Sequence, residues 1–287
     1  MSNSNTLTAA ELIGSPAPFF RLLRLAAADS HQFPDAIEAL RTHRLTGIHV
    51  RSVFSGEQMH ALTHRLQGGS DRLLRTSFPE QFRSWFYGRN LNLMGTNPDS
   101  YFAEAEQFHQ CLQELMPGEM NLLQRLFEVL SQLDGQRPYR PAPGPVPGTE
   151  YMGITVREHA EGGYIPPHCD NEQRVRLTYD HLSTLVGNHM YSAVLMIAPA
   201  ENGGCLKIYD RVIESAESEF NSGASAGKGD LSGVAAAEIP SAAGDVVIVD
   251  SGRYVHEVTP VVGKQSRWVA CSFMSRALDR DAVYCWG

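Results

Sequence analysis

Residues 245–274 read DVVIVDSGRYVHEVTPVVGKQSRWVACSFM, and their pattern indicates a β-sheet fold. Three short apolar segments are separated by Ser251-Gly252 and by a turn at Gly263. Short apolar runs bounded by glycine and proline are typical of β-strands joined by turns. We therefore expect strands at 245–250, 254–260 and 267–275, with a hairpin that returns Arg267 beside the strand that carries His256.

The rest of the carboxy-terminal half shows the same pattern. Further strands are expected at 151–158, 164–170, 191–198, 205–210 and 236–240. Helical periodicity comes earlier, at 34–44, after Ser55, at 100–115 and at 118–133. Helices followed by strands do not alternate as a Rossmann-type sheet requires. The chain is predicted to be mainly β with flanking helices, a sandwich or jelly roll buttressed by amino-terminal α-helices.

The length of 287 residues suits one large core. We expect a single domain, 1–287, with an amino-terminal extension (1–33), mostly helical support and linker (34–149), and a jelly-roll catalytic core (150–287). Five prolines within 134–149 predict an extended linker. The small, polar residues 215–233 predict either a disordered surface insertion or a lid over substrate.

Composition narrows the partners and the compartment. A net charge of −8 argues against nucleic acid, for which a basic stripe is the usual footprint. Five scattered cysteines without CxxC spacing suit reduced thiols in a cytoplasm. Neither a signal peptide nor an apolar run of about 18 residues is found. We expect a cytoplasmic monomer or homodimer that acts on a small molecule, with no membrane partner.

The tripeptide His168-Cys169-Asp170 follows Pro166-Pro167 at the end of one predicted strand. Residues two apart on a strand face the same way, so His168 and Asp170 can present a nitrogen and a carboxylate oxygen together. His-x-Asp alone is a weak signal. With His256 from a distant strand, it makes two histidines and one carboxylate, the facial triad of non-heme Fe(II) oxygenases. His168, Asp170 and His256 are therefore the candidate metal ligands and catalytic residues.

Arg267 lies eleven residues after His256. Its guanidinium offers a fixed fork of donors suited to a carboxylate and stays charged at working pH. The simpler alternative is a surface arginine beside a core histidine. The order and spacing of the four residues favour the metal-site interpretation.

These residues resemble the iron(II)/2-oxoglutarate-dependent oxygenase superfamily, in which His-x-Asp/Glu is followed by a distal His and, about ten positions later, by a basic residue. Gly162-Gly163-Tyr164 and Glu201-Asn202-Gly203-Gly204 also look like this superfamily. The stretch from Gly252 to Trp286 is similar to the carrier-independent halogenases of indole alkaloid pathways. Those enzymes carry Gly where this chain has Asp170, and chloride takes the vacated coordination position.

The resemblance implies a double-stranded β-helix (cupin-like) and the cofactors Fe(II), 2-oxoglutarate and O₂. Because Asp170 is retained, it implies hydroxylation of an unactivated C–H bond of a free amino acid or natural-product intermediate, with release of succinate and CO₂. Desaturation, epoxidation or cyclisation by the same chemistry is the alternative, followed by a non-catalytic cupin-like metal-binding protein.

The resemblance also assigns the cosubstrate's far carboxylate to Arg267. A companion donor is expected from His159 or Thr155, because Val269 stands where the superfamily often has Ser. Arg157, on the same predicted strand, is a candidate for binding an anionic substrate. Asn171 follows the metal pair and is a candidate for the substrate mouth.

Overall fold

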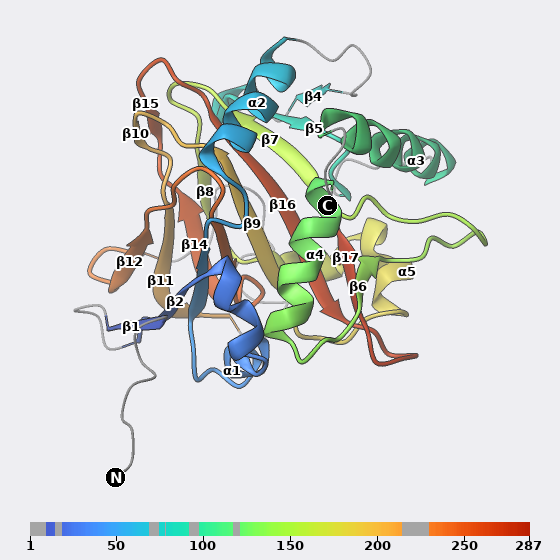
Figure 1. The fold of residues 1–287 in the computed structure, drawn as a ribbon, viewed down its shortest axis with the longest axis horizontal. Helices are drawn as coiled ribbons and strands as arrows, with labels where there is room; N and C mark the ends of the chain where they lie inside the picture. Colours follow the sequence, from blue (N-terminus) through green and yellow to red (C-terminus); the bar gives the residue numbers. More distant parts are fainter. Residues whose placement is uncertain are drawn as a thin grey trace.

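The computed structural model describes residues 10–14, 19–68, 75–77, 79–91, 98–116, 121–213 and 230–287. Within them the chain forms an 11-stranded sheet, a 4-stranded sheet and a two-stranded pair (Figure 1). The larger sheet has the order β1 (Ala10–Gly14), β2 (Arg21–Ala26), β3 (Gly47–Arg51), β13 (Val246–Val249), β9 (Tyr191–Ala198), β16 (Arg267–Arg276), β7 (Thr155–His159), β5 (Ser84–Tyr87) and β4 (Arg75–Ser77). Two further strands branch from it, because β17 (Val283–Trp286) pairs with β16 and β6 (Tyr139–Pro141) pairs with β17.

The smaller sheet has the order β12 (Ala236–Ile239), β11 (Leu206–Val212), β14 (Tyr254–Val258), β8 (Ile165–His168). The separate pair is β10 (Asn202–Gly203) with β15 (Val261–Val262). Buried apolar side chains join the two main sheets into one core, among them Phe20, Leu22, Ile208, Ile239, Val247 and Val249. This is the jelly roll expected from the sequence, and the eight predicted strands are present with ends shifted by a few residues.

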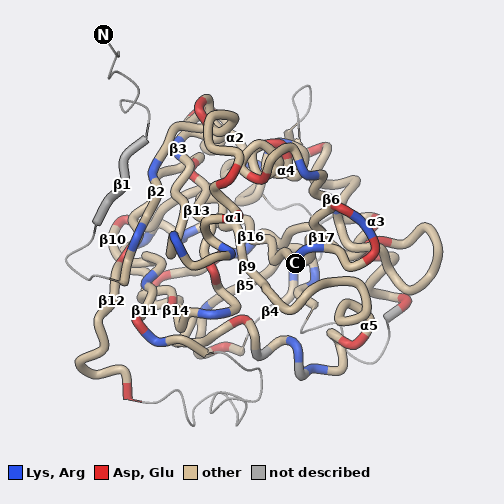
Figure 2. Tube along the Cα trace, turned by 90° about the horizontal axis from the view of Figure 1, so that it is seen from below, with Lys and Arg blue, Asp and Glu red and all other residues tan. Residues whose placement is uncertain are grey.

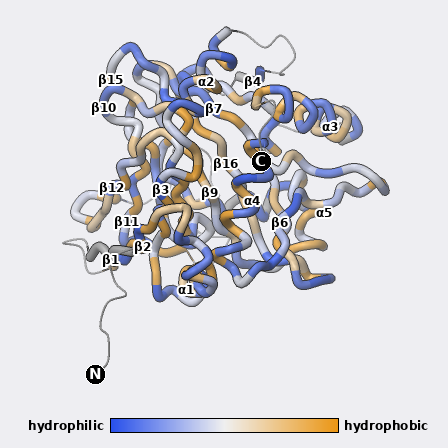
Figure 3. Tube along the Cα trace, viewed as in Figure 1, coloured by the Kyte–Doolittle hydropathy of each residue, from blue (hydrophilic) through white to orange (hydrophobic). Residues whose placement is uncertain are grey.

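The predicted helices correspond to α1 (Ala36–Arg41), α2 (Gly56–Gln67), α3 (Pro98–Leu115) and α4 (Leu122–Leu133). Capping boxes begin two of them, because Ser55 pairs with Gln58 and Asn121 with Gln124. Figure 1 shows α1, α2 and α4 in front of the larger sheet. They cover β9 and β16, whose residues are almost all buried and largely hydrophobic (Figure 3). The helices thus buttress the sheet that supplies Arg267.

Three features differ from the expectation. The strands that carry His256 and Arg267 do not form the expected hairpin, because β14 lies in the smaller sheet and β16 in the larger one. The proposed extension 1–33 contributes β2, which pairs in parallel with β3, and a 3-10 helix, η1 (Ala27–Gln32). The proposed linker contributes β6, which pairs in parallel with β17. A strand containing Pro141 is tolerated there because β6 lies at a sheet edge, where a missing N–H removes no ladder bond. Residues 215–229 of the expected lid or insertion lie outside the described residues.

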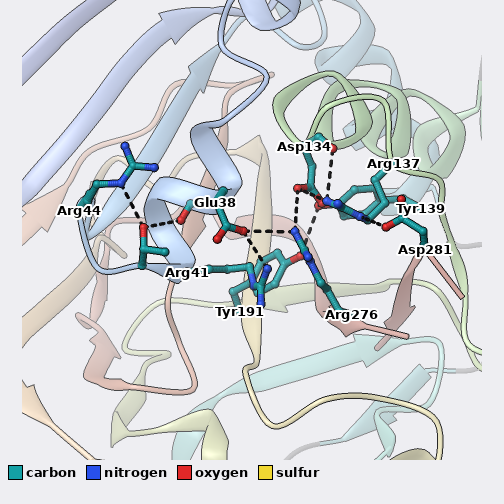
Figure 4. Close-up of polar contacts among 10 residues, drawn as sticks. Glu38, Arg41, Arg44, Asp134, Arg137, Tyr139, Tyr191, Arg276 and Asp281 are labelled. Carbon is teal, nitrogen blue, oxygen red and sulfur yellow. Dashed lines mark hydrogen bonds and ion pairs between the residues drawn. The ribbon is translucent and has the colours of Figure 1, made fainter. Parts of the chain in front are cut away.

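A polar network ties the helices to the sheet (Figure 4). Glu38 of α1 accepts from Arg41 at 2.9 Å and from Arg276 of β16 at 3.2 Å. Asp134, at the end of α4, accepts from Arg137 and from the Tyr139 hydroxyl. Figure 2 shows basic and acidic residues interspersed along the described trace. None of the described helices has the length and apolar character needed to cross a membrane.

Candidate metal centre and anion site

The two candidate histidine ligands come from neighbouring strands. β8 and β14 pair antiparallel with His168 directly opposite His256, and the two ring centroids are 4.2 Å apart. Asp170 follows β8 and places Oδ1 3.6 Å from His168 Nε2 and Oδ2 3.6 Å from His256 Nε2. One ligand atom from each residue lies within 4.8 Å of the others, and among the described residues no other such group of three is found. The predicted triad is therefore assembled.

The tautomers of the two histidines follow from their hydrogen bonds. His168 Nδ1 is 2.8 Å from the carbonyl oxygen of Pro166, and His256 Nδ1 is 3.0 Å from that of Tyr254. A carbonyl oxygen only accepts, so each Nδ1 carries the proton. Each Nε2 is left with a lone pair turned toward Asp170. This is the arrangement in which outer hydrogen bonds orient metal-binding imidazoles.

Asp170 is held differently from the expectation that it lies on the strand. β8 ends at His168, and Asp170 begins a 3-10 helix, η4 (Asp170–Val175). Cys169 is extended and buried on the opposite side, in a cluster with Tyr209, so the predicted alternation holds locally. The Asp170 amide donates to the Ser251 carbonyl at 2.9 Å, and Gln173 Nε2 lies 3.4 Å from Oδ1. Hydrogen bonds to both the backbone and the side chain of Asp170 thus hold its carboxylate in place.

Arg267 begins β16 and is 3 % exposed. Burial, and next the nearby Arg157, lower its pKa to about 10, so it remains protonated at neutral pH. Among the described residues no carboxylate acts on the charge of Arg267, and its Nε has no hydrogen-bond partner there. Gly204 makes room for it: φ is +61°, and a Cβ there would lie 2.8 Å from Arg267 Cδ. A buried, uncompensated guanidinium is costly unless an anion pairs with it.

His159 lies opposite Arg267 across the β7–β16 ladder and is fully buried. Burial, then Arg267 and Arg157, lower its pKa well below the usual value, so the ring is neutral. Its Nδ1 is 2.7 Å from Ser84 Oγ, on β5. The structure therefore places His159 beside Arg267.

Thr155 lies four residues from His159 along β7, opposite Cys271, and contacts Arg157 instead of Arg267. Its Oγ1 is 3.4 Å from Arg157 Nε. The Arg157 guanidinium packs 5.0 Å from the Phe86 ring centroid and 5.5 Å from that of Phe273. Within the described chain, its Nη2 has no hydrogen-bond partner. Arg157 is thus a second buried cation, held between two aromatic rings.

Arg157 and Arg267 lie on the same sheet face as Cys271, which interacts electrostatically with Asp170. Arg267 and Cys271 lie on the same face of β16 because strand side chains alternate, and Arg157 joins them across the ladder. The negative charge of Asp170 reaches the buried Cys271 thiol, whose pKa is raised mainly by burial. Asn171 is buried in η4 next to Asp170. The site therefore combines two histidines of the smaller sheet and Asp170 of η4 with two guanidinia of the larger sheet.

Four contributing residues carried no signal in the sequence: Ser84, Gln173, Ser251 and Cys271. Their contacts depend on strand register and on the path of η4, which sequence spacing does not reveal. Gly204 belongs to the Gly203-Gly204 pair noted above, and its role follows only from where Arg267 lies. Two imidazoles and one carboxylate can hold Fe(II) and leave positions open, and the arginines can bind carboxylates.

Comparison with known proteins gives a family and a fold. The model of a family described as carrier-protein-independent halogenase WelO5 matches residues 19–287. An N-substituted L-amino acid dioxygenase from Burkholderia ambifaria has a similar structure, with TM-score 0.60, 16 % identity, and coverage of 97 % of this chain and 98 % of that one. The structure of its complex with alpha-KG is similar with a TM-score of 0.55 and 14 % identity, and the coverage of both chains is the same. A search of the curated proteins finds no match.

Proposed function

The chain belongs to the carrier-protein-independent halogenase WelO5 family, within the iron(II)/2-oxoglutarate oxygenases, and on that premise we propose that it hydroxylates an unactivated C–H bond of a free small molecule. The observation that carries the proposal is Asp170. Its carboxylate lies 3.6 Å from both histidine Nε2 atoms, in the position that the resemblance assigns to Gly in the halogenases. A carboxylate ligand there fills the place that chloride would need.

The residues fit the group that this function requires. His168, Asp170 and His256 would hold iron(II), because both Nε2 atoms carry lone pairs and the carboxylate lies between them. When bound, the iron with 2-oxoglutarate and O₂ supplies the oxidation of the C–H bond and releases succinate and CO₂. The protein's part is to hold the metal, orient the two organic molecules and keep bulk water away.

Arg267 would bind the far carboxylate of 2-oxoglutarate. It is buried and protonated, and within the described residues it has no ion-pair partner, so a dicarboxylate would supply the missing charge. His159 lies beside it and is assigned to this same cosubstrate site. Thr155 is assigned to holding Arg157, which it contacts.

Arg157 would bind a second anionic group near the triad. Its stacking against Phe86 and Phe273 fixes the plane of the guanidinium and leaves Nη2 free of partners in the described structure. That group is either a carboxylate of the substrate or the 2-oxo acid end of the cosubstrate. Asn171, next to Asp170, is assigned to the substrate mouth.

The helices support one catalytic unit. α1, α2 and α4 cover the sheet that supplies Arg157, His159 and Arg267, so 1–287 is best treated as a single domain. The same iron chemistry could also end in desaturation, epoxidation or cyclisation. A non-catalytic cupin-like metal protein would have no use for a buried, unpaired Arg267.

The family match makes halogenation the second candidate. The two are separated by aerobic incubation of the protein with iron(II), 2-oxoglutarate, chloride and a panel of small amino acids and their N-substituted derivatives. We expect succinate and a product that has gained one oxygen atom. A product with the isotope pattern of chlorine would overturn the assignment of hydroxylation.

A further inference from the structure

Three buried side chains form a row across neighbouring strands of the larger sheet. Ser84 on β5 lies opposite His159 on β7, and His159 lies opposite Arg267 on β16. Their exposed fractions are 3 %, 0 % and 3 %. Polar groups buried this deeply are expected to be hydrogen-bonded, so each donor and acceptor in the row can be accounted for.

The Ser84 hydroxyl has two polar neighbours. Its Oγ lies 2.7 Å from the Phe82 carbonyl oxygen and 2.7 Å from His159 Nδ1. The carbonyl can only accept, and the hydroxyl has a single hydrogen, so that hydrogen is directed to Phe82. The hydrogen in the second contact must therefore come from His159 Nδ1. The opposite assignment would leave two oxygen acceptors facing each other at 2.7 Å.

The state of the ring at Nε2 follows. The neutral His159 ring has one N–H, and Ser84 places it on Nδ1. Nε2 then carries a lone pair and can only accept. In the described chain neither His159 Nε2 nor Arg267 Nε has a hydrogen-bond partner, although the two residues face each other across the ladder.

We propose that His159 is a positioning residue that accepts a hydrogen bond from the Arg267 guanidinium, and that Ser84 fixes the tautomer in which it can do so. This differs from the role of companion donor, since a bare Nε2 would repel a carboxylate. In this relay Arg267 donates to His159 Nε2, His159 Nδ1 donates to Ser84 Oγ, and Ser84 Oγ donates to the Phe82 carbonyl. The relay thereby directs the remaining guanidinium donors toward the bound anion. That the bound anion is 2-oxoglutarate rests on the proposed function.

The tautomer can be measured on the unaltered protein. With ¹⁵N-labelled histidine, NMR near neutral pH should show His159 protonated at Nδ1 and bare at Nε2, and loss of the signal in His159→Gln assigns it. A proton on Nε2 overturns the proposal. This readout needs neither iron nor turnover. The expected tautomer without 2-oxoglutarate binding in calorimetry would support the relay and count against the proposed function.

A variant tests the consequence for binding. Ser84→Ala removes the acceptor for Nδ1–H, so we expect the dissociation constant and the KM for 2-oxoglutarate to rise on the order of 10-fold, with kcat and iron(II) affinity unchanged. Ser84→Thr keeps the hydroxyl and should restore the wild-type values. Equal losses in kcat and iron binding, or no rescue by Thr in a folded protein, would make Ser84 merely structural and overturn the relay.

Discussion

His168 and His256 are cross-strand partners whose Nδ1 atoms each donate to the carbonyl of the residue two positions earlier, Pro166 and Tyr254. The two strands thus impose the same tautomer on both rings and turn both Nε2 atoms toward Asp170. The metal-binding state of the imidazoles is built into the backbone before any metal arrives.

Replacement of one ring tests this arrangement. His256→Gln should abolish stoichiometric iron(II) binding, because only one imidazole and one carboxylate remain to hold an ion that lies low in the divalent affinity order. Anaerobic equilibrium dialysis with iron(II) measures it. His60→Gln, on the exposed side of α2, is the matched control and should bind as the wild type does. Retained stoichiometric binding by His256→Gln would contradict the assignment.

Removal of the buried Arg267 guanidinium should weaken the binding of 2-oxoglutarate. Arg267→Gln is expected to raise the KM for 2-oxoglutarate about 10–100-fold, the cost of losing a charged hydrogen bond to a carboxylate. Arg51→Gln, an exposed arginine at the end of β3, should leave the KM unchanged. Steady-state succinate formation measures both. An unchanged KM in Arg267→Gln would place the carboxylate elsewhere.

A substitution at Gly204 tests whether Arg267 needs the space that the glycine leaves. Gly204→Ala forces a Cβ to within 2.8 Å of Arg267 Cδ at a φ of +61°. We expect a loss of about 1–2 kcal/mol in the free energy of unfolding and a raised KM for 2-oxoglutarate. Gly56→Ala is the control, since no atom lies within 4 Å of its added Cβ. Equal effects of the two changes would argue against the close approach.

The buried Asp250 should make stability depend on pH. It lies 3.4 Å from both His43 Nδ1 and His189 Nε2, and burial raises its pKa to about 7 while Arg253 opposes the rise. A folded pKa above the unfolded value means that stability is present at low pH and lost as pH rises through 4 to 7. Burial is the largest of the causes that lower the pKa of the neighbouring His189 to about 4.

Asp250→Asn removes this loss. Its destabilisation relative to wild type should therefore be smaller at roughly pH 8 than at roughly pH 5, by at most about 3 kcal/mol. Urea unfolding at the two pH values measures it. A larger penalty at the higher pH would mean that the carboxylate is stabilised in its ionised form.

The sequence predicted the strands and the triad because both depend on short-range signals. Short apolar runs bounded by turn residues marked β9, β13 and β16, and His-x-Asp needs only the local geometry of an extended Cys169. The short β6 was missed because its prolines indicate a linker, and its pairing with β17 is non-local. The row Ser84–His159–Arg267 depends on the register of three strands far apart in sequence, which is set by the folded core.

Asp170 gives the most direct test, because its carboxylate is assigned as the third iron ligand at the position where the family's halogenases carry Gly. Aerobic incubation with iron(II) and 2-oxoglutarate, in the absence of chloride, should give iron-dependent succinate from the wild type and none from Asp170→Ala. Asp210→Ala, an exposed carboxylate on the neighbouring β11, should behave as the wild type. Equal succinate formation by wild type and Asp170→Ala would contradict the assigned role of this carboxylate.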